Sequence, residues 1–118
     1  ALEDTVLEED VRLDNQIQVG HNVRIGAHTA MAGCVAIAGS ARIGRYCLVG
    51  GGAGIAGHLS VCDRVTITAM SLVTASITEP GEYASAMAAQ EARRFRRNAA
   101  RFRQLDALAR RMGAPPKD

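Results

Sequence analysis

The stretch from Ile37 to Ile55, IAGSARIGRYCLVGGGAGI, places an isoleucine or a valine at every sixth position. The same spacing continues in both directions and meets an aliphatic residue each time, at Leu7, Leu13, Val19, Ile25, Met31, Ile37, Ile43, Val49, Ile55, Val61, Ile67 and Val73. A second column, four residues further on and running from Val11 to Ile77, is smaller but mostly apolar. A period of six matches neither an α-helix, which repeats at 3.6 residues, nor a simple alternating strand.

Such a repeat indicates a chain that forms a short strand, turns a corner and begins again. Three hexads close a triangular coil of eighteen residues, and successive coils stack as parallel strands about 4.8 Å apart. Gly or Ala often follows the aliphatic position, as at Gly20 and Gly44, and we expect these residues to permit the tight corners. A sandwich of short strands would need irregular turn clusters every eight to twelve residues, which the sequence lacks. We therefore predict an all-β parallel β-helix of about four coils over residues 1–78.

Residues 79–118 have a different composition. Nine basic and five acidic residues give them a net charge of +4, whereas seven acidic and five basic residues give 1–78 a net charge of −2. After a loop we predict one C-terminal α-helix within 84–112, starting between Ser85 and Glu91. Its apolar stripe has Phe95, Phe102 and Ala109 at seven-residue spacing, and it ends at Gly113, which Pro115-Pro116 follows.

Composition narrows the possible partners and location. No apolar run approaches the length of a membrane-spanning helix, so any membrane contact is expected to be peripheral. The three cysteines, Cys34, Cys47 and Cys62, form no CxxC pair, which argues against a zinc knuckle or a disulfide framework. With no secretory leader visible, we expect a cytoplasmic protein. Aromatic residues are only 3% of the chain, too few for stacking on bases, and we expect no nucleic-acid partner.

The predicted coil places chemically useful side chains together. His21 and Gly39 are eighteen residues apart, and His58 is two coils and one residue beyond His21, so all three are predicted at one edge of the prism. Asp14 and Asn15 fall one corner away, at roughly 17–20 Å, too far to touch His21 within one chain. A neighbouring subunit would have to bring them in, and we predict a homotrimer.

Several segments resemble the UDP-3-O-(3-hydroxyacyl)glucosamine N-acyltransferase family of hexapeptide-repeat enzymes. They are Leu13-Asp14-Asn15-Gln16, Gly20-His21-Asn22-Val23, Ile37-Ala38-Gly39-Ser40, Ile55-Ala56-Gly57-His58, Glu79-Pro80-Gly81-Glu82-Tyr83 and the Arg-rich run around Asn98. The resemblance implies a left-handed β-helix and a C-terminal fragment, because the family also has earlier coils and an N-terminal uridine-binding domain. The segment Ala88-Ala89-Gln90 departs from the Pro-Leu-Gln type sequence usual in the family.

The resemblance also implies the chemistry. Family members transfer a 3-hydroxyacyl group from acyl carrier protein, a phosphopantetheine thioester, to the 2-amine of the nucleotide sugar UDP-3-O-acylglucosamine in lipid A biosynthesis, with no other cofactor and no metal. His21 matches the general base, Gly39 the oxyanion-hole position and His58 a second histidine that binds substrate or assists the intermediate. Asp14 and Asn15 match residues near the substrate, although both residue types also favour turns.

The arginines Arg93, Arg97 and Arg101 share a predicted helical face at four-residue spacing. In the family, the C-terminal helices contact the acidic acyl carrier protein, so the resemblance implies carrier docking; the alternative is a solvated basic face. Two other functions remain open at this stage. One is a trimerisation scaffold without activity. The other is a zinc enzyme of the γ-carbonic anhydrase kind, which needs three converging histidines, although His28 is expected one corner away from His58.

Overall fold

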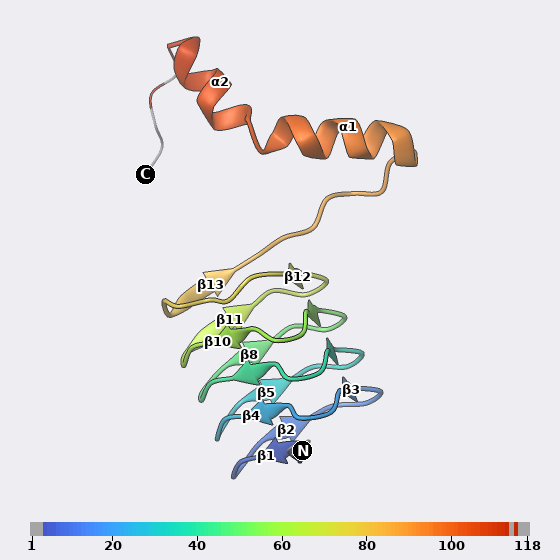
Figure 1. The fold of residues 1–118 in the computed structure, drawn as a ribbon, viewed down its shortest axis with the longest axis vertical. Coiled ribbons are helices and arrows are strands. Elements are labelled where there is room, and N and C mark those ends of the chain that lie inside the picture. The colour runs from blue at the N-terminus through green and yellow to red at the C-terminus, as the bar shows by residue number, and fades with distance from the viewer. Residues whose placement is uncertain (1–3, 114, 116–118) are drawn as a thin grey trace. The chain divides into compact units, whose positions relative to one another are not determined.

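The computed structural model describes residues 4–113 and 115 and shows a parallel β-solenoid followed by two short helices (Figure 1). The solenoid belongs to a compact unit that spans Ala1–Ala86, and the helices belong to a second unit, Met87–Asp118. Its strands are β1 (Val6–Leu7), β2 (Arg12–Leu13), β3 (Gln18–Val19), β4 (Arg24–Ile25), β5 (Ala30–Met31), β6 (Ala36–Ile37), β7 (Arg42–Ile43), β8 (Leu48–Val49), β9 (Gly54–Ile55), β10 (Ser60–Val61), β11 (Val65–Ile67), β12 (Leu72–Val73) and β13 (Gly81–Tyr83).

The strands form three parallel sheets, one on each side of the prism. The first sheet has the order β1-β4-β7-β10, the second β13-β11-β8-β5-β2 and the third β12-β9-β6-β3. Leu7 pairs with Ile25, and Val19 pairs with Ile37, so each coil takes eighteen residues. This register confirms the predicted parallel coil. We call the turns from first to second sheet the first edge, those from second to third the second edge, and those from third to first the third edge.

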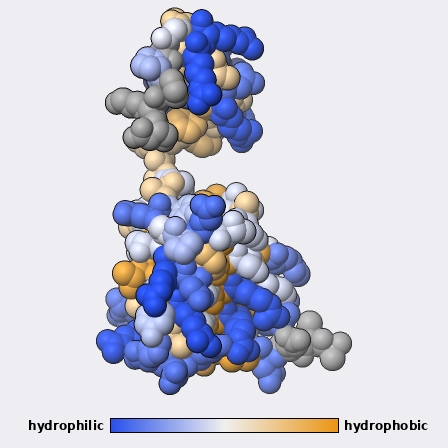
Figure 2. All heavy atoms as spheres, turned by 90° about the vertical axis from the view of Figure 1, so that its left-hand side faces the viewer, coloured by the Kyte–Doolittle hydropathy of each residue, from blue (hydrophilic) through white to orange (hydrophobic). Residues whose placement is uncertain are grey.

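Both apolar columns face the interior of the solenoid. The six-residue column is buried from Ile25 to Val73, and the second column is buried from Val23 to Ser71. Two polar residues in the second column keep their hydrogen bonds. Thr29 Oγ1 donates to the carbonyl of Gly44 at 2.7 Å, and it accepts from Cys47 N at 3.1 Å. On the outside, hydrophilic side chains cover much of the solenoid face seen in Figure 2.

Cys47 lies in this interior column with no exposed surface, as predicted for a core residue. Burial raises the pKa of its thiol above the ordinary value, because the thiolate would lose its hydration. The side chain therefore behaves as a small apolar group rather than as a nucleophile.

The residues that bend the chain at the corners are not the ones that we predicted. A positive φ recurs every six residues from Asp10 to Met70, and Gly52 is the only glycine among these positions. The Gly and Ala residues that follow the strands lie two residues earlier and have another role. A Cβ added to Gly20 would lie 2.7 Å from Gly39 N in the next coil. These small residues therefore permit close approach between coils, not the turn itself.

The solenoid also continues beyond the predicted boundary at residue 78. Ile77 bridges Val61, and Gly81 pairs with Val65, so the register of the last coil is sixteen residues instead of eighteen. Ile77 consequently occupies the six-residue column rather than the second one. Ser71 Oγ then binds the next segment, since it accepts from Ser85 N at 3.0 Å. The added strand β13 and this contact extend the first unit to Ala86.

The second unit contains α1 (Ala92–Phe102) and α2 (Leu105–Arg111) in place of the single predicted helix. Glu91 caps α1, because its carboxylate accepts from the backbone N–H groups of Arg93 and Arg94 at 3.0 and 3.1 Å. A tighter turn ends α1, where Gln104 N donates to the carbonyl of Arg101 at 2.9 Å. The apolar stripe is therefore interrupted. Among the described residues, no helix is long and apolar enough to cross a membrane.

Candidate functional site

The third edge carries His21, Gly39 and His58 on successive coils. His21 lies between β3 and β4, Gly39 between β6 and β7, and His58 between β9 and β10. Backbone hydrogen bonds join the three turns: Ser40 N donates to the carbonyl of His21 at 2.9 Å, and His58 N donates to that of Gly39 at 3.1 Å. Both histidines are exposed. The structure thus brings these three residues to one edge, as the eighteen-residue register predicts.

The imidazole of His21 lies against the face of Gly39. A Cβ added to Gly39 would lie 2.7 Å from His21 Nε2 and 3.0 Å from Cε1, so only glycine leaves room for the ring in this orientation. Within the described part of the chain, the ring nitrogens of His21 form no hydrogen bond. His21 Nε2 is therefore close to the Gly39 backbone and open to a ligand.

The backbone N–H of Gly39 occupies a turn position that binds carboxylate oxygens elsewhere in this protein. At the first edge, the equivalent N–H groups of Ala27 and Arg45 donate to Glu8 and Asp63 at 3.1 and 2.8 Å. At the second edge, Asn15 N donates to Asp14 at 2.7 Å. The Gly39 N–H has no hydrogen-bond partner among the described residues. It is therefore an available donor in a position suited to a negatively charged oxygen.

The structure places Asp14 and Asn15 at the second edge, one corner before His21. The strand β3 separates them from it, and both side chains are exposed. The carbonyl of Asn15 accepts from Cys34 N at 3.0 Å, which ties this turn to the coil above. Within one chain these residues therefore do not join the His21 group.

His28 lies at the first edge and has its own partners. Its Nδ1 is 2.9 Å from Asp10 Oδ2, and its ring stacks on that of Tyr46 with 4.8 Å between centroids. Hydrogen bonds from His28 and Arg12 lower the pKa of Asp10 below its ordinary value. Over residues 4–113 and 115, no three His, Cys, Asp or Glu side chains are grouped so that they could hold a metal ion. Three converging histidines are thus not present in that part.

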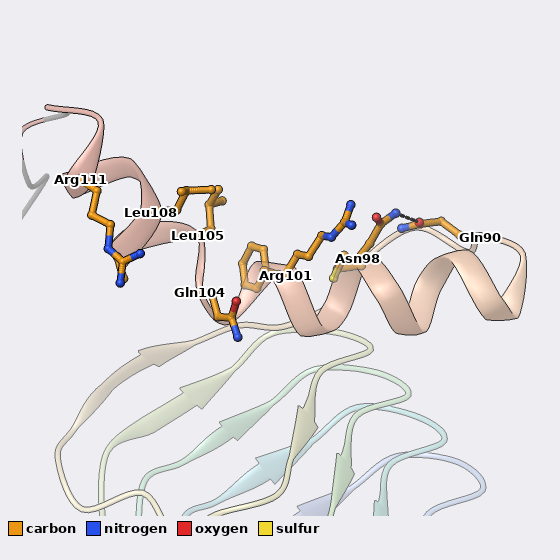
Figure 3. A pocket seen from close by; sticks show the side chains of 10 residues that line it. Gln90, Asn98, Arg101, Gln104, Leu105, Leu108 and Arg111 are labelled. Atoms are coloured by element: carbon orange, nitrogen blue, oxygen red, sulfur yellow. Dashed lines mark hydrogen bonds between the residues drawn. The ribbon is translucent and has the colours of Figure 1, made fainter.

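The second unit has a cavity of about 700 Å³ between its two helices (Figure 3). Its walls include Phe102, Leu105 and Leu108, with Arg101 beside them. Asn98 Nδ2 donates to Gln90 Oε1 at 2.6 Å at one end of the cavity. Of the three arginines singled out by spacing, Arg93 and Arg97 are exposed on α1, and Arg101 also lines this cavity.

The sequence did not place three further residues of the third edge, Gly20, Asn22 and Ser40, in the site. Gly20 leaves space beside Gly39 N, and Asn22 Nδ2 donates to Ser40 Oγ at 3.1 Å. The signal for the second contact was available, because Asn22 and Ser40 are eighteen residues apart and therefore stack.

No protein-family model matches the chain. Comparison with individual known proteins does find similar sequences. It is 64% identical over all 118 residues to a UDP-3-O-acylglucosamine N-acyltransferase of Xanthomonas campestris pv. campestris, and covers 35% of that protein. A protein of the same name from Alcanivorax borkumensis is 63% identical over 55 residues, which are 47% of this chain and 16% of the relative.

Solved structures match the fold at low sequence identity. PerB from Caulobacter crescentus, determined with CoA and GDP-perosamine, has a TM-score of 0.54 at 17% identity, covering 70% of this chain and 51% of that one. Serine acetyltransferase isoform 3 from Entamoeba histolytica has a TM-score of 0.55 at 15% identity, covering 80% and 41%.

The eighteen-residue coil and the solved structures give this chain the fold of the hexapeptide-repeat proteins. More particularly, the chain is homologous over its whole length to the UDP-3-O-acylglucosamine N-acyltransferase of Xanthomonas campestris pv. campestris. It spans about a third of the length of the Xanthomonas relative.

Proposed function

We propose that this chain supplies the catalytic edge of an N-acyltransferase. The reaction moves a 3-hydroxyacyl group from the thioester of acyl carrier protein to the 2-amine of UDP-3-O-acylglucosamine, in the cytoplasm and toward lipid A. The names of the relatives support this substrate class. The observation that carries the proposal is that His21 Nε2 lies beside Gly39, whose N–H has no hydrogen-bond partner among the described residues and occupies a turn position that binds carboxylate oxygens elsewhere in the solenoid.

The proposed chemistry follows from these two groups. His21 accepts a proton from the amine as the nitrogen attacks the thioester carbon, and the carbonyl oxygen becomes negative. The Gly39 N–H donates to that oxygen. When the intermediate collapses, the C–S bond breaks and the thiolate takes the proton from the imidazolium, so an amide and a free thiol result. His58, on the next coil, is proposed to bind substrate or assist the intermediate.

Asp14 and Asn15 would join this site only from another copy of the chain. We therefore propose a homotrimer in which the second edge of one subunit faces the third edge of its neighbour. The separation of these residues from His21 by β3 supports that arrangement. In it, Asp14 or Asn15 orients the sugar or His21.

Replacing His21 in the full-length protein tests the proposal. His21→Ala should lower turnover about 10²- to 10⁴-fold in an assay with acyl carrier protein thioester, since it removes a general base. His28→Ala is the matched control, because it also removes a turn histidine, and it should keep most activity. Both variants should sediment as trimers. Unchanged turnover in His21→Ala would show that His21 is not the general base. Sedimentation of the wild-type protein as a monomer would show that the site is not shared between subunits.

A further inference from the structure

The third edge holds a second column of side chains, one residue beyond His21 and Gly39. Its members are Asn22, Ser40 and His58, all with positive φ, at 55°, 63° and 61°. The partly buried hydrogen bond from Asn22 Nδ2 to Ser40 Oγ, 3.1 Å long, joins the residue after His21 to the residue after Gly39. It therefore links the two turns that carry the proposed base and the proposed oxyanion donor.

We propose that Asn22 and Ser40 are a positioning pair that holds the His21 imidazole against Gly39. This inference rests on the proposed function. The backbone bond between these turns, from Ser40 N to the carbonyl of His21, recurs at the other edges, for example from Cys34 N to the carbonyl of Asn15. Side-chain contacts at the positions of Asn22 and Ser40 also occur at the other edges, between Asp10 and His28 at 2.9 Å and between Cys34 Sγ and Gln16 Oε1 at 3.6 Å. The Asn22–Ser40 bond is the one that lies next to His21 and Gly39, and there this tether restricts rotation of one turn relative to the other.

The histidine at the first edge is held in a different way. His28 is fixed by its own ring nitrogen, which lies 2.9 Å from Asp10 Oδ2. His21 has no such contact at either ring nitrogen among the described residues, and Nε2, the nitrogen proposed to accept the proton, has to stay free for the substrate. Asn22 and Ser40 restrain the turn through neighbouring residues and leave both ring nitrogens of His21 open. A positioning effect on His21 therefore requires no contact between the pair and the reacting atoms.

The test removes the tether without adding backbone strain. Ser40→Gly and Asn22→Gly delete the two side chains at positive-φ positions, which glycine adopts readily. Cys34→Gly is the matched control, because Cys34 has the same φ of 63° and the equivalent turn position on the second edge. In the full-length protein, each test variant should lower kcat about 3- to 10-fold, the weight of one hydrogen bond, with KM for both substrates unchanged.

The double variant should be no slower than either single one, because both lose the same bond. Cys34→Gly should keep its kcat at a similar thermal midpoint. Ser40→Ala, which keeps the Cβ, replaces Ser40→Gly if the glycine loosens the coil. Wild-type kcat in the Ser40 variants, an equal loss in Cys34→Gly or multiplicative losses in the double variant would overturn the pair's role. Loss in His21→Ala with none in Ser40→Gly would reject only this inference, whereas full activity in His21→Ala would reject the proposed base itself.

Discussion

At the scale of single residues, the absence of a side chain at Gly39 decides where the His21 imidazole can lie. The His21 ring packs where a side chain of residue 39 would begin, because its Nε2 lies 2.7 Å from the position that a Cβ would take. The position does not have a positive φ, so alanine fits the backbone, and the three atoms nearest to an added Cβ all belong to the imidazole. Substitution at this glycine should therefore displace the ring and leave the coil intact.

Gly39→Ala should lower kcat at least about tenfold, because a displacement near 1 Å can cost about a hundredfold in rate. Gly33→Ala is the control. Gly33 has the same turn position at the second edge, and its added Cβ would be 3.4 Å from the carbonyl oxygen of Asn15, close to an ordinary contact. Steady-state kinetics and thermal unfolding of both variants check this. Full activity in Gly39→Ala would show that the ring orientation seen here is not the productive one.

The relation between His21 and Gly39 could be predicted from the sequence, because a register of eighteen residues converts a count directly into a stack. The same count reaches Ser40 from Asn22, but it does not show that an amide and a hydroxyl will bond. Nor could it assign the small residues correctly. Gly20 and Gly44 follow strands in the pattern of turn residues, yet their role is close packing between coils, which depends on where the backbone of the next coil lies.

At the scale of elements, the carboxylate of Glu8 joins the first two coils at the first edge. Glu8 accepts from Arg24 Nη2 at 2.6 Å and from the backbone N–H of Ala27 at 3.1 Å, so it connects the first two coils. The hydrogen bond from Arg24 is the main cause that lowers the pKa of Glu8 below its ordinary value of 4.5, and the bond from Ala27 adds to it. Because the folded-state pKa is the lower one, the charged contact stabilises the fold above pH 4.5 and is lost as pH falls below it.

Glu8→Gln should therefore lower the thermal midpoint at pH 7, and the difference from wild type should vanish in strong acid, where Glu8 is protonated. Thermal unfolding between pH 2 and 7 measures this. Glu79→Gln is the control, since among the described residues the Glu79 carboxylate has no ion-pair partner. A difference that persists at the acid end, or an equal loss in Glu79→Gln, would contradict the assignment.

In the last coil and in the helices, the spacing of apolar residues no longer predicts the structure. Sequence spacing continues through Ile77, yet the strand register shortens to sixteen residues there, because the turn after β12 is shorter. Likewise, the seven-residue spacing of Phe95, Phe102 and Ala109 passes through the turn at Gln104 unbroken. Neither position has a glycine or proline to signal the change, so side-chain spacing alone predicts one more regular corner and one continuous helix.

At the scale of the whole molecule, charge separates the two parts of the chain. The net charge is −2 over residues 1–78 and +4 over residues 79–118, where five bases and seven acids give the first value and nine bases and five acids the second. In the second part, Arg93, Arg97 and Arg101 all lie within α1 at four-residue spacing, as predicted. Their docking role stays a prediction. An acidic carrier would be attracted to this helix, and salt would weaken the attraction, since screening shortens to about 8 Å at physiological ionic strength.

Replacing Arg93, Arg97 and Arg101 by Gln should raise the KM for acyl carrier protein, leave kcat nearly unchanged and flatten the salt dependence of kcat/KM. The matched control replaces Arg94, Arg96 and Arg103, which removes the same charge from the same segment. If a specific face docks the carrier, the first triple variant has the larger KM. Equal effects would mean that net charge alone attracts the carrier. A loss of kcat at unchanged KM would instead mean that the helix contributes to the chemical step, and carrier docking on this face would be rejected.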